Sequence, residues 1–162
     1  MFRVFCILAF GVISGCTPQN AQQSDEDVAL LRESLPGINQ KCIDIFRTEG
    51  VTAIPQDVRE CFPMEERKRW SGLWLDEMEG SRFCPEPVDE CTFHSKGERI
   101  WLSFADDIRE KSRPDRYSTE VLYEIEFVGS LTSISGAFGH QGGSDKEIVV
   151  ERLVSLEPVS GS

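Results

Sequence analysis

The sequence predicts an α+β protein, with short N-terminal helices packed on a small antiparallel β-barrel of OB-like type. Two patterns indicate this. Between residues 25 and 62, apolar residues recur every three or four positions, as on one face of a helix. From residue 63 to residue 158 they alternate with polar residues instead, which is typical of strands with one buried face. Four or five such strands, some long enough to bend, favour closure into a barrel.

The segment 25–62, called the helical front below, begins with a predicted helix over residues 25–35. Its first three residues are acidic, and negative charge stabilises a helix N-terminus. Proline and glycine interrupt the pattern at positions 36 and 37. The apolar positions of this helix are Val28, Leu31 and Leu35.

A second helix and a short third turn complete the helical front. The second helix is expected to end at Gly50 and the third turn to cover residues 56–61, with Val58 and Cys61 turned inward. We expect the apolar faces of these helices to pack on the barrel rather than to bind a partner protein. The expected buried face of the second helix carries Ile38, Cys42, Ile45 and Phe46.

The barrel body, residues 63–158, contains four segments with strand patterns. They cover residues 70–75, 99–105, 120–128 and 146–156. In the first, Gly72 marks an expected bulge or bend. In the second segment, the positions expected to face inward are Ile100, Leu102 and Phe104. In the third segment they are Val121, Tyr123, Ile125 and Phe127. In the fourth segment, Val149, Glu151 and Leu153 lie on the face opposite to Ile148 and Val150.

Composition limits the partners that this chain can bind. The 162 residues carry 28 Asp and Glu against 17 Lys and Arg, a formal charge of −11. Such a protein repels phosphate backbones over a Debye length of about 8 Å, so nucleic acid is not expected as a partner. The length of the chain beyond residue 24 suits one domain, and it contains no repeat or second linker.

The first residues have the pattern of a secretory signal. Arg3 supplies a positive start, and residues 4–13 are apolar. As a helix these ten residues rise only about 15 Å, which is half of a bilayer core. The next segment, Ile13-Ser14-Gly15-Cys16, resembles the lipobox of bacterial lipoproteins, with Ile13 where the family usually has leucine. The alternatives are an ordinary signal peptide with an incidental cysteine, or a buried N-terminal strand.

The lipobox resemblance implies where the protein is held. Residues 1–15 would be removed as a signal peptide, and Cys16 would be acylated and held in a membrane. Thr17 after the cysteine favours the periplasmic face of the outer membrane of a Gram-negative bacterium. Residues 16–24 then form the lipidated cysteine and a polar, flexible tether.

Four further cysteines remain for the folded part. In an oxidising envelope an even number indicates two disulfides, for which three connectivities exist. We prefer the local pairing of Cys42 with Cys61 and Cys84 with Cys91, each worth roughly 2.5–3.5 kcal/mol in the chain-entropy model. Free thiols are one alternative, and a zinc site with His94 beside Cys84 and Cys91 is another, although no C-x2-C pair is present.

Neither histidine stands in a recognised catalytic arrangement. His140 lies in the glycine-rich segment 135–144, where it is expected to stabilise a hairpin loop, and His94 is expected at the surface. The sequence after Trp74 contains carboxylates at Asp76, Glu77 and Glu79, with Arg82 nearby; we expect a solvated turn there rather than acid–base chemistry. We therefore expect no catalytic residue, no metal site and no cofactor.

Two other groups are candidates for contacts with a ligand or partner. The tryptophans Trp70, Trp74 and Trp101 either fill the barrel core or form an aromatic platform, and His140 is added to them as a possible contact. The other group is a basic cluster in the polar segment 106–118, interleaved with acidic residues and expected to be an exposed loop. Its members are Arg109, Lys111, Arg113 and Arg116.

Three functional classes follow from these features. The first is a membrane-anchored, non-catalytic binding or structural module whose partner is an envelope protein or glycan. The second is an inhibitor or immunity-type protein of an envelope enzyme, and the third is a hydrolase that uses His140. The segment with Gly129, Gly139-His140 and Gly143 before a valine-rich strand is also similar to small uncharacterised Gram-negative proteins, which implies no particular activity.

Overall fold

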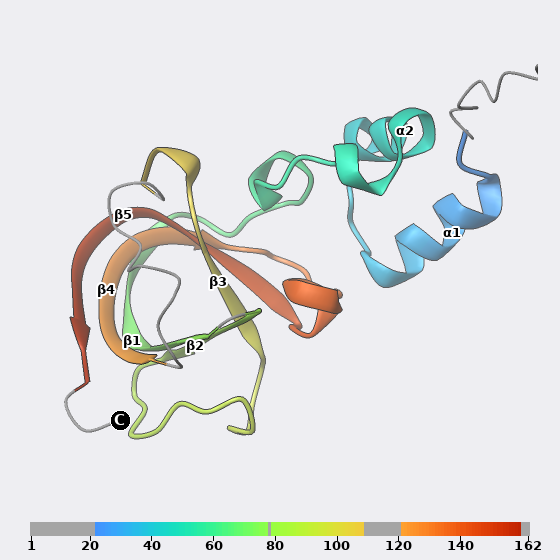
Figure 1. The fold of residues 1–162 in the computed structure, drawn as a ribbon. Helices are drawn as coiled ribbons and strands as arrows, with labels where there is room; N and C mark the ends of the chain where they lie inside the picture. Colours follow the sequence, from blue (N-terminus) through green and yellow to red (C-terminus); the bar gives the residue numbers. More distant parts are fainter. Residues whose placement is uncertain (1–21, 78, 109–120, 160–162) are drawn as a thin grey trace, which may run out of the picture.

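The computed structural model describes residues 22–77, 79–108 and 121–159, and these form the helical front and a closed barrel (Figure 1). Within this part of the chain, no helix has both the length and the apolar character needed to cross a bilayer. The helices are α1 (Asp25–Ser34), α2 (Gln40–Glu49), η1 (Val51–Ala53), η2 (Val58–Glu60) and η3 (His140–Gly142). The strands are β1 (Lys68–Glu77), β2 (Gly80–Pro85), β3 (Ile100–Phe104), β4 (Val121–Leu131) and β5 (Lys146–Pro158).

The two α-helices begin at polar caps. Ser24 and Asp27 form a capping box at α1, in which each side chain bonds the backbone N–H of the other residue. Asn39 caps α2 by accepting from the Cys42 N–H at 3.0 Å, and its amide also donates to the Glu60 carbonyl at 2.6 Å. This second bond ties the start of α2 to η2, so the cap also positions the third turn.

The helical front has a small core of its own. Val28, Ile38, Cys42, Ile43, Phe46 and Cys61 are buried together in it. The prediction for α2 is wrong at one position, because Ile43 is buried and Ile45 is only half-buried. Two elements, α1 and η2, approach α2, so its buried face includes Ile43. The predicted Cys42–Cys61 disulfide is present and joins α2 to the end of η2, with the Cα atoms 5.6 Å apart.

The barrel closes in the order β1-β2-β3-β5-β4, with β4 paired back to β1 (Figure 1). The predicted small barrel and N-terminal helices are therefore confirmed. The prediction of a wholly antiparallel barrel is wrong, because β3 and β5 pair in parallel. The chain leaves β4, which pairs with β1, and returns as β5 between β3 and β4. In that position β5 runs antiparallel to β4 and parallel to β3.

Aromatic side chains fill the barrel interior. Trp74 stacks on Tyr123 with ring centroids 5.3 Å apart, and Phe83 meets Phe127 edge-on at the same distance. The predicted alternation in β3 and β4 is confirmed, because Ile100, Leu102 and Phe104 and then Tyr123, Ile125 and Phe127 are buried. In β5 the segment 148–150 is buried on both faces, because Val149 packs in a separate apolar cluster outside the barrel core.

Glycine permits close approach of the backbones at two positions in the barrel. A Cβ on Gly72 would lie 2.2 Å from the Cys84 carbonyl oxygen, and one on Gly129 would lie 2.1 Å from the Val149 carbonyl oxygen. The pairing of β1 runs without a shift through Gly72, so the bulge predicted there is absent from both of its ladders. The register shifts lie instead in the β4–β5 pair, one of them next to Gly129.

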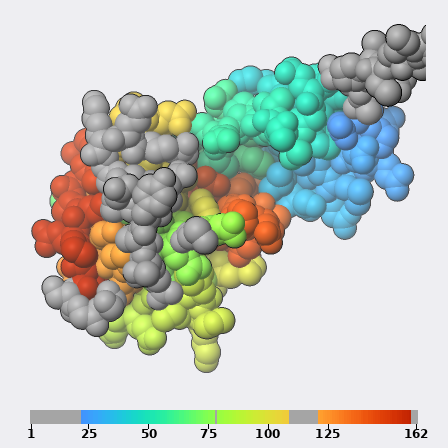
Figure 2. Space-filling view, viewed as in Figure 1, coloured from blue at the N-terminus to red at the C-terminus, as the bar shows by residue number. Residues whose placement is uncertain are grey.

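The helical front lies at one side of the barrel as a separate lobe (Figure 2). A third apolar cluster joins the two, with Val58 of the front packed among Ala105, Phe138 and Val149 of the barrel. The loop between β4 and β5 also reaches the front, because the Ala137 N–H donates to the carbonyl of Ser34 at 3.0 Å. The predicted packing of the front on the barrel thus occurs at its η2 end and at this loop.

Candidate functional site

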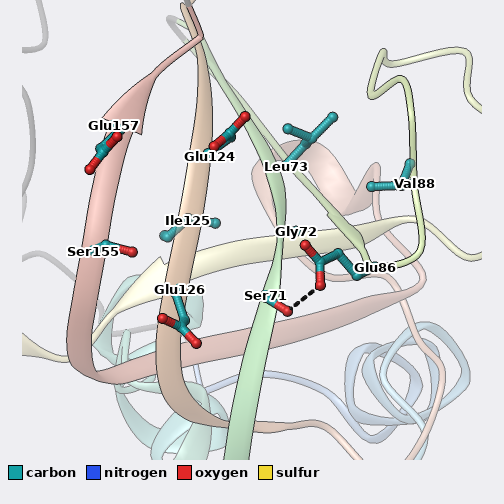
Figure 3. Close-up of a pocket in the computed structure, with 10 residues that line it drawn as sticks. All are labelled: Ser71, Gly72, Leu73, Glu86, Val88, Glu124, Ile125, Glu126, Ser155 and Glu157. Carbon is teal, nitrogen blue, oxygen red and sulfur yellow. Dashed lines mark hydrogen bonds between the residues drawn. The ribbon is translucent and has the colours of Figure 1, made fainter.

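An acidic groove crosses the outer face of the barrel (Figure 3). It is a hollow of about 450 Å³ over β1, β4 and β5, with the start of the β2–β3 connection as one wall. Its carboxylates are Glu86, Glu124, Glu126 and Glu157. The other residues that line it are Ser71, Gly72, Leu73, Val88, Ile125 and Ser155.

Two of these four carboxylates already have partners. Glu86 accepts a hydrogen bond from the Ser71 hydroxyl at 2.7 Å. Glu126 accepts from Arg69 at 2.5 Å, and this bond holds the pKa of Glu126 below its usual range. Glu124 and Glu157 lie opposite each other in the β4–β5 register. In the described part of the chain, no three His, Cys, Asp or Glu side chains are arranged to hold a metal ion.

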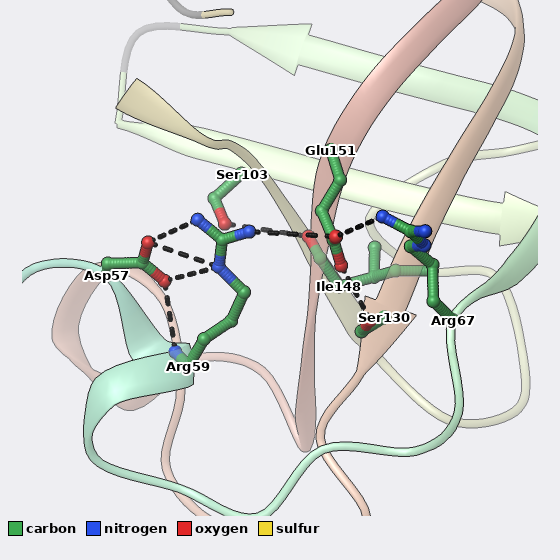
Figure 4. Close-up of polar contacts among 7 residues, drawn as sticks. All are labelled: Asp57, Arg59, Arg67, Ser103, Ser130, Ile148 and Glu151. Atoms are coloured by element: carbon green, nitrogen blue, oxygen red, sulfur yellow. Dashed lines mark hydrogen bonds and ion pairs between the residues drawn. The ribbon is translucent and has the colours of Figure 1, made fainter. Parts of the chain in front are cut away.

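A second polar cluster connects the helical front to the barrel (Figure 4). Its centre is Glu151 on β5, whose side chain is 17% exposed. Glu151 accepts from the Ser130 hydroxyl at 2.6 Å and pairs with Arg67 at 3.5 Å and with Arg59 of η2 at 3.8 Å. Arg59 is also bound by Asp57, whose hydrogen bonds raise the pKa of Arg59. This cluster is a structural joint, since every polar group in it has a partner within the protein.

A pocket of about 740 Å³ lies between β2, the start of β3 and the loop that connects them. We call it the β2–β3 pocket. In Figure 1 this connecting loop, residues 86–99, passes below β2 and β3. The predicted Cys84–Cys91 disulfide is present and closes the first part of the loop, with the Cα atoms 5.8 Å apart. The lining residues are Arg82, Phe83, Cys84, Pro85, Pro87, Val88, Glu90, Thr92, His94, Ser95, Lys96, Gly97, Glu98 and Ile100.

The barrel wall is weakest at this pocket. Phe83 and Ile100 form the single Cα pair between β2 and β3, whereas β1 and β4 pair along nine positions. The Ser81 hydroxyl on β2 also bridges to β3: it donates to the Leu102 carbonyl at 2.8 Å and accepts from the Leu102 N–H at 3.3 Å. A side chain on the inner face of β2 therefore adds to the short backbone ladder between the two strands.

Arg82 lies on the outer face of β2, because its neighbours Ser81 and Phe83 point into the barrel. The loop covers it so completely that only 4% of the residue is exposed. One terminal nitrogen donates to the Ser95 carbonyl at 3.0 Å, while the buried Nε has no partner. Burial, and then the nearby charge of Arg99, lower the pKa of Arg82. Arg82 thus lines the pocket and carries a buried guanidinium with an unused donor.

The structure separates the three tryptophans. Trp74 is 1% exposed and belongs to the barrel core, so it offers no surface to a ligand. Trp70 is half-buried, packs edge-on against Phe83 and has the Lys68 ammonium 4.2 Å from its ring. Trp101 is half-buried under the β4–β5 loop, where a Cβ on Gly139 would lie 2.4 Å from its ring. The three side chains do not form one platform.

His140 lies in η3 on the β4–β5 loop. Its Nε2 atom is 3.8 Å from a carboxylate oxygen of Glu79, at the turn between β1 and β2. That distance is too long for a hydrogen bond, and the two side chains are 43% and 68% exposed. Gly139 and Gly142 have positive φ angles of 71° and 69°, as expected for a glycine-rich turn.

The remaining predicted residues lie elsewhere. His94 is exposed and lines the β2–β3 pocket, and Cys84 and Cys91 are joined in a disulfide, which leaves no thiolates for the zinc alternative. Cys16 and the basic cluster of residues 109–116 lie outside the described residues. The segment expected as a solvated turn instead contributes residues 76–77 to the end of β1 and residues 80–83 to β2.

No family model, curated protein or solved structure matches this chain. The pocket beside Arg82 is not evident from the sequence alone. The sequence interpretation missed it, because Arg82 stood among acidic neighbours and was assigned to an exposed turn. The one local signal was the short apolar pair Phe83-Cys84 after a glycine, which is compatible with a strand buried on both faces.

Proposed function

We propose that this protein is a lipid-anchored, non-catalytic binding module of the bacterial cell envelope, and that the β2–β3 pocket is its binding site. The observation that carries this proposal is the pocket itself. Its volume of about 740 Å³ falls in the range typical of small-molecule and cofactor sites. A disulfide fixes one wall and a paired strand forms the other, so the pocket is preformed.

The anchor rests on the lipobox resemblance at Cys16. The tether that follows it leads into α1, and each of its residues spans at most about 3.3–3.6 Å, which limits the distance of the helical front from a bilayer. The two disulfides support an oxidising compartment outside the cytoplasm. Ser24 caps the N-terminus of α1, which supports Ser24 as the last residue of the tether.

We also propose that the barrel is OB-like. It has five strands among the described residues and a Greek-key order in which β5 lies between β3 and β4. OB barrels bind oligosaccharides and oligonucleotides on the face of strands 2 and 3 and on adjoining loops. The β2–β3 pocket lies at the corresponding place, and the net charge of −11 favours a sugar over a nucleic acid there.

A non-catalytic role is supported by the histidines. A general base must reach the proton that it removes through a hydrogen bond of about 2.6–3.2 Å, usually with a second group to orient it. His140 has only an exposed carboxylate 3.8 Å away. His94 bonds through its backbone N–H to the Thr92 hydroxyl at 3.2 Å.

Site-specific photocrosslinking in intact cells tests the binding module. A benzophenone amino acid is placed at Lys96, an exposed residue of the pocket, and in a matched variant at Val51, which is 64% exposed on the helical front. We expect a defined glycan or protein adduct from position 96 and none of the same mass from position 51. Identical adducts from both positions would contradict the assignment of the pocket.

The anchor has a separate test. Cells that express the wild-type chain or Cys16→Ser are labelled with a clickable fatty acid and fractionated. We expect the label and membrane recovery for the wild type and neither for the variant. An unlabelled wild-type protein would remove the anchor from the proposal and leave the pocket to be judged by crosslinking.

The acidic groove favours a second candidate function, that of an inhibitor or immunity-type protein which docks on a basic enzyme surface. Glu124 and Glu157 face each other across it, and neither pairs with a basic side chain of the described residues. A complex of this kind depends on salt, because charge complementarity mainly governs association. The double variant Glu124→Gln/Glu157→Gln should then lose protection of cells against a lytic enzyme, whereas Glu49→Gln on the helical front should keep it.

A further inference from the structure

Arg82 is a buried cation for which the described residues supply no paired carboxylate. One terminal nitrogen of its guanidinium donates to the Ser95 carbonyl, and its Nε has no partner. The carboxylate whose charge acts on it is Asp145. Asp145 is already bound by Arg99, at 2.8 Å and 3.2 Å, and accepts the Arg99 backbone N–H at 2.9 Å. Its oxygens are therefore committed to a different guanidinium.

Such an arrangement is costly for the isolated protein. Arginine is almost never fully buried unless it is paired, and it stays protonated in proteins. A neutral residue of similar shape would fill the same space under the loop without that cost. The lowered pKa of Arg82 has the same cause, since burial disfavours the charged form. A buried donor without a partner calls for a functional explanation.

The pocket beside Arg82 gives that explanation. A guanidinium presents its N–H groups in a planar fork that matches the two oxygens of a carboxylate, and these charge-assisted bonds are the strong ones. The hydroxyls of Thr92 and Ser95 and the ring of His94 also line the pocket, together with the apolar side chains of Phe83 and Ile100. The pocket volume is many times that of a single ion, so the pocket has room for an organic molecule.

The charges around the pocket limit how many negative charges a ligand can carry there. Glu90 and Glu98 line it as well, while Lys96 and His94 are exposed at its rim. One buried guanidinium can compensate one negative charge, and the two glutamates together with the net charge of −11 repel a second. A singly charged carboxylate therefore fits better than a phosphate dianion.

We propose that the β2–β3 pocket binds an organic monocarboxylate whose carboxylate pairs with Arg82. This inference rests on the proposed function, because it names the chemistry of the ligand in the same pocket. Acidic sugars and the C-terminus of a short peptide both provide this group, and the experiment separates them.

The test uses the full chain in detergent micelles, isothermal titration calorimetry for affinity, and NMR of backbone amides for location. The probes are sodium glucuronate with its neutral methyl ester, and N-acetyl-L-alanine with its neutral methylamide. Sodium phosphate is a fifth probe. We expect one of the acids to bind about tenfold to a hundredfold more tightly than its neutral twin, and phosphate to bind more weakly than that acid. The amides of β2 and of residues 92–98 should shift.

Three variants assign the effect to Arg82. Arg82→Met should abolish the preference for the acid, and its thermal midpoint without ligand should be unchanged or higher. A purely structural role would lower that midpoint. Arg82→Lys keeps the charge but lacks the fork and should lose about tenfold in affinity for the acid. Arg32→Met, which removes an exposed guanidinium on α1 outside the pocket, should keep the preference.

The outcomes distinguish this inference from the proposed function. If an acid and its neutral twin bind equally tightly and shift the same amides, the carboxylate inference is wrong and the pocket still binds a ligand. If no probe shifts the amides of the pocket, the inference is overturned, and crosslinking from position 96 decides the proposed function independently. If Arg82→Met does not fold, the acid–neutral comparison on the wild type and the Arg82→Lys affinity decide.

Discussion

The helical front and the barrel contain cores of different kinds. Six buried residues form the core of the front, and two of them are the halves of a disulfide. Eleven buried residues form the barrel core, and five of these are aromatic. Each barrel strand is also paired on both sides, so the sheet has no free edge among the described strands. The barrel is held by packing and closure, whereas the front depends on a covalent link and on its contacts with the barrel.

This difference follows from size. A small unit buries too little apolar surface to offset the conformational entropy that it loses, and small secreted domains commonly compensate with disulfides. The Cys84–Cys91 bridge instead joins the end of β2 to the loop over the pocket. One disulfide thus supports a fold and the other shapes a site.

The largest effect is expected in the barrel core. Phe127 is 0% exposed and packs edge-on against Phe83. Phe127→Ala should lower the free energy of unfolding by about 3–5 kcal/mol, because it leaves a large cavity. Denaturant titration followed by far-UV circular dichroism measures this. Leu30→Ala on α1, where the residue is 57% exposed, is the control and should change stability by less than about 0.5 kcal/mol. Equal losses in both variants would contradict the stated contrast between the two regions.

The next effect concerns the disulfide of the front. Removing the Cys42–Cys61 bridge with a double serine variant should cost roughly 3 kcal/mol, given the sequence separation of 19 residues. Limited proteolysis should then cut within residues 22–62 while the barrel stays intact. The matched variant without Cys84 and Cys91, which lie 7 residues apart, should be cut in the β2–β3 loop instead. Cleavage of the barrel strands in the first variant would show that the front supports the barrel.

The joint between the two regions gives a smaller effect. Glu151→Gln keeps a group that can accept from Ser130 but removes the charge that holds Arg59 and Arg67. We expect a loss of about 1–2 kcal/mol, since the carboxylate is mostly buried and its bonds are charge-assisted. Glu157→Gln on the exposed end of the same strand is the control. Hydrogen exchange should show faster opening of α2 and η2 in Glu151→Gln, and unchanged exchange there would refute a coupling role.

The smallest expected effect is the change in stability at acidic pH. Bonds to Arg99 lower the folded-state pKa of Asp145, and bonds to Ser24 lower that of Asp27. Each group therefore adds stability that is present above the ordinary aspartate pKa of about 3.9 and is lost as the pH falls through the lower folded-state value. We expect unfolding free energies to decline below about pH 4. Asp145→Asn should flatten this decline for the barrel amides only, and Asp27→Asn for the front only, as read by hydrogen exchange.

Much of the fold was predictable from local patterns. Charge, apolar spacing and the Pro36-Gly37 interruption located α1, and apolar spacing located η2. Alternation located β1, β3, β4 and β5, because each of those strands has one face in the core. β2 was missed because the residues at 80–84 are buried on both faces and therefore do not alternate. The parallel β3–β5 pair was also missed, because the direction of pairing depends on how the barrel closes rather than on either strand.

The site was less predictable than the fold. Nothing next to Arg82 in the sequence indicates burial, since a loop some ten residues later covers it and Ser95 supplies its carbonyl partner. The joint likewise combines Arg59, Ser130 and Glu151, which are far apart in the chain. The disulfide pairing was predicted correctly because both loops are short, which favours local closure.

The Cys42–Cys61 bridge also has a mechanical consequence. Tension applied at the N-terminal side of α1 reaches residue 42 and passes through the sulfur atoms to residue 61, which lies seven residues before the start of β1 at Lys68. The intervening 18 residues, counted from the sequence separation of 19, carry none of that load. A chain of that length extends by about 60 Å when it is pulled straight, so the bridge makes the linkage short and stiff under force.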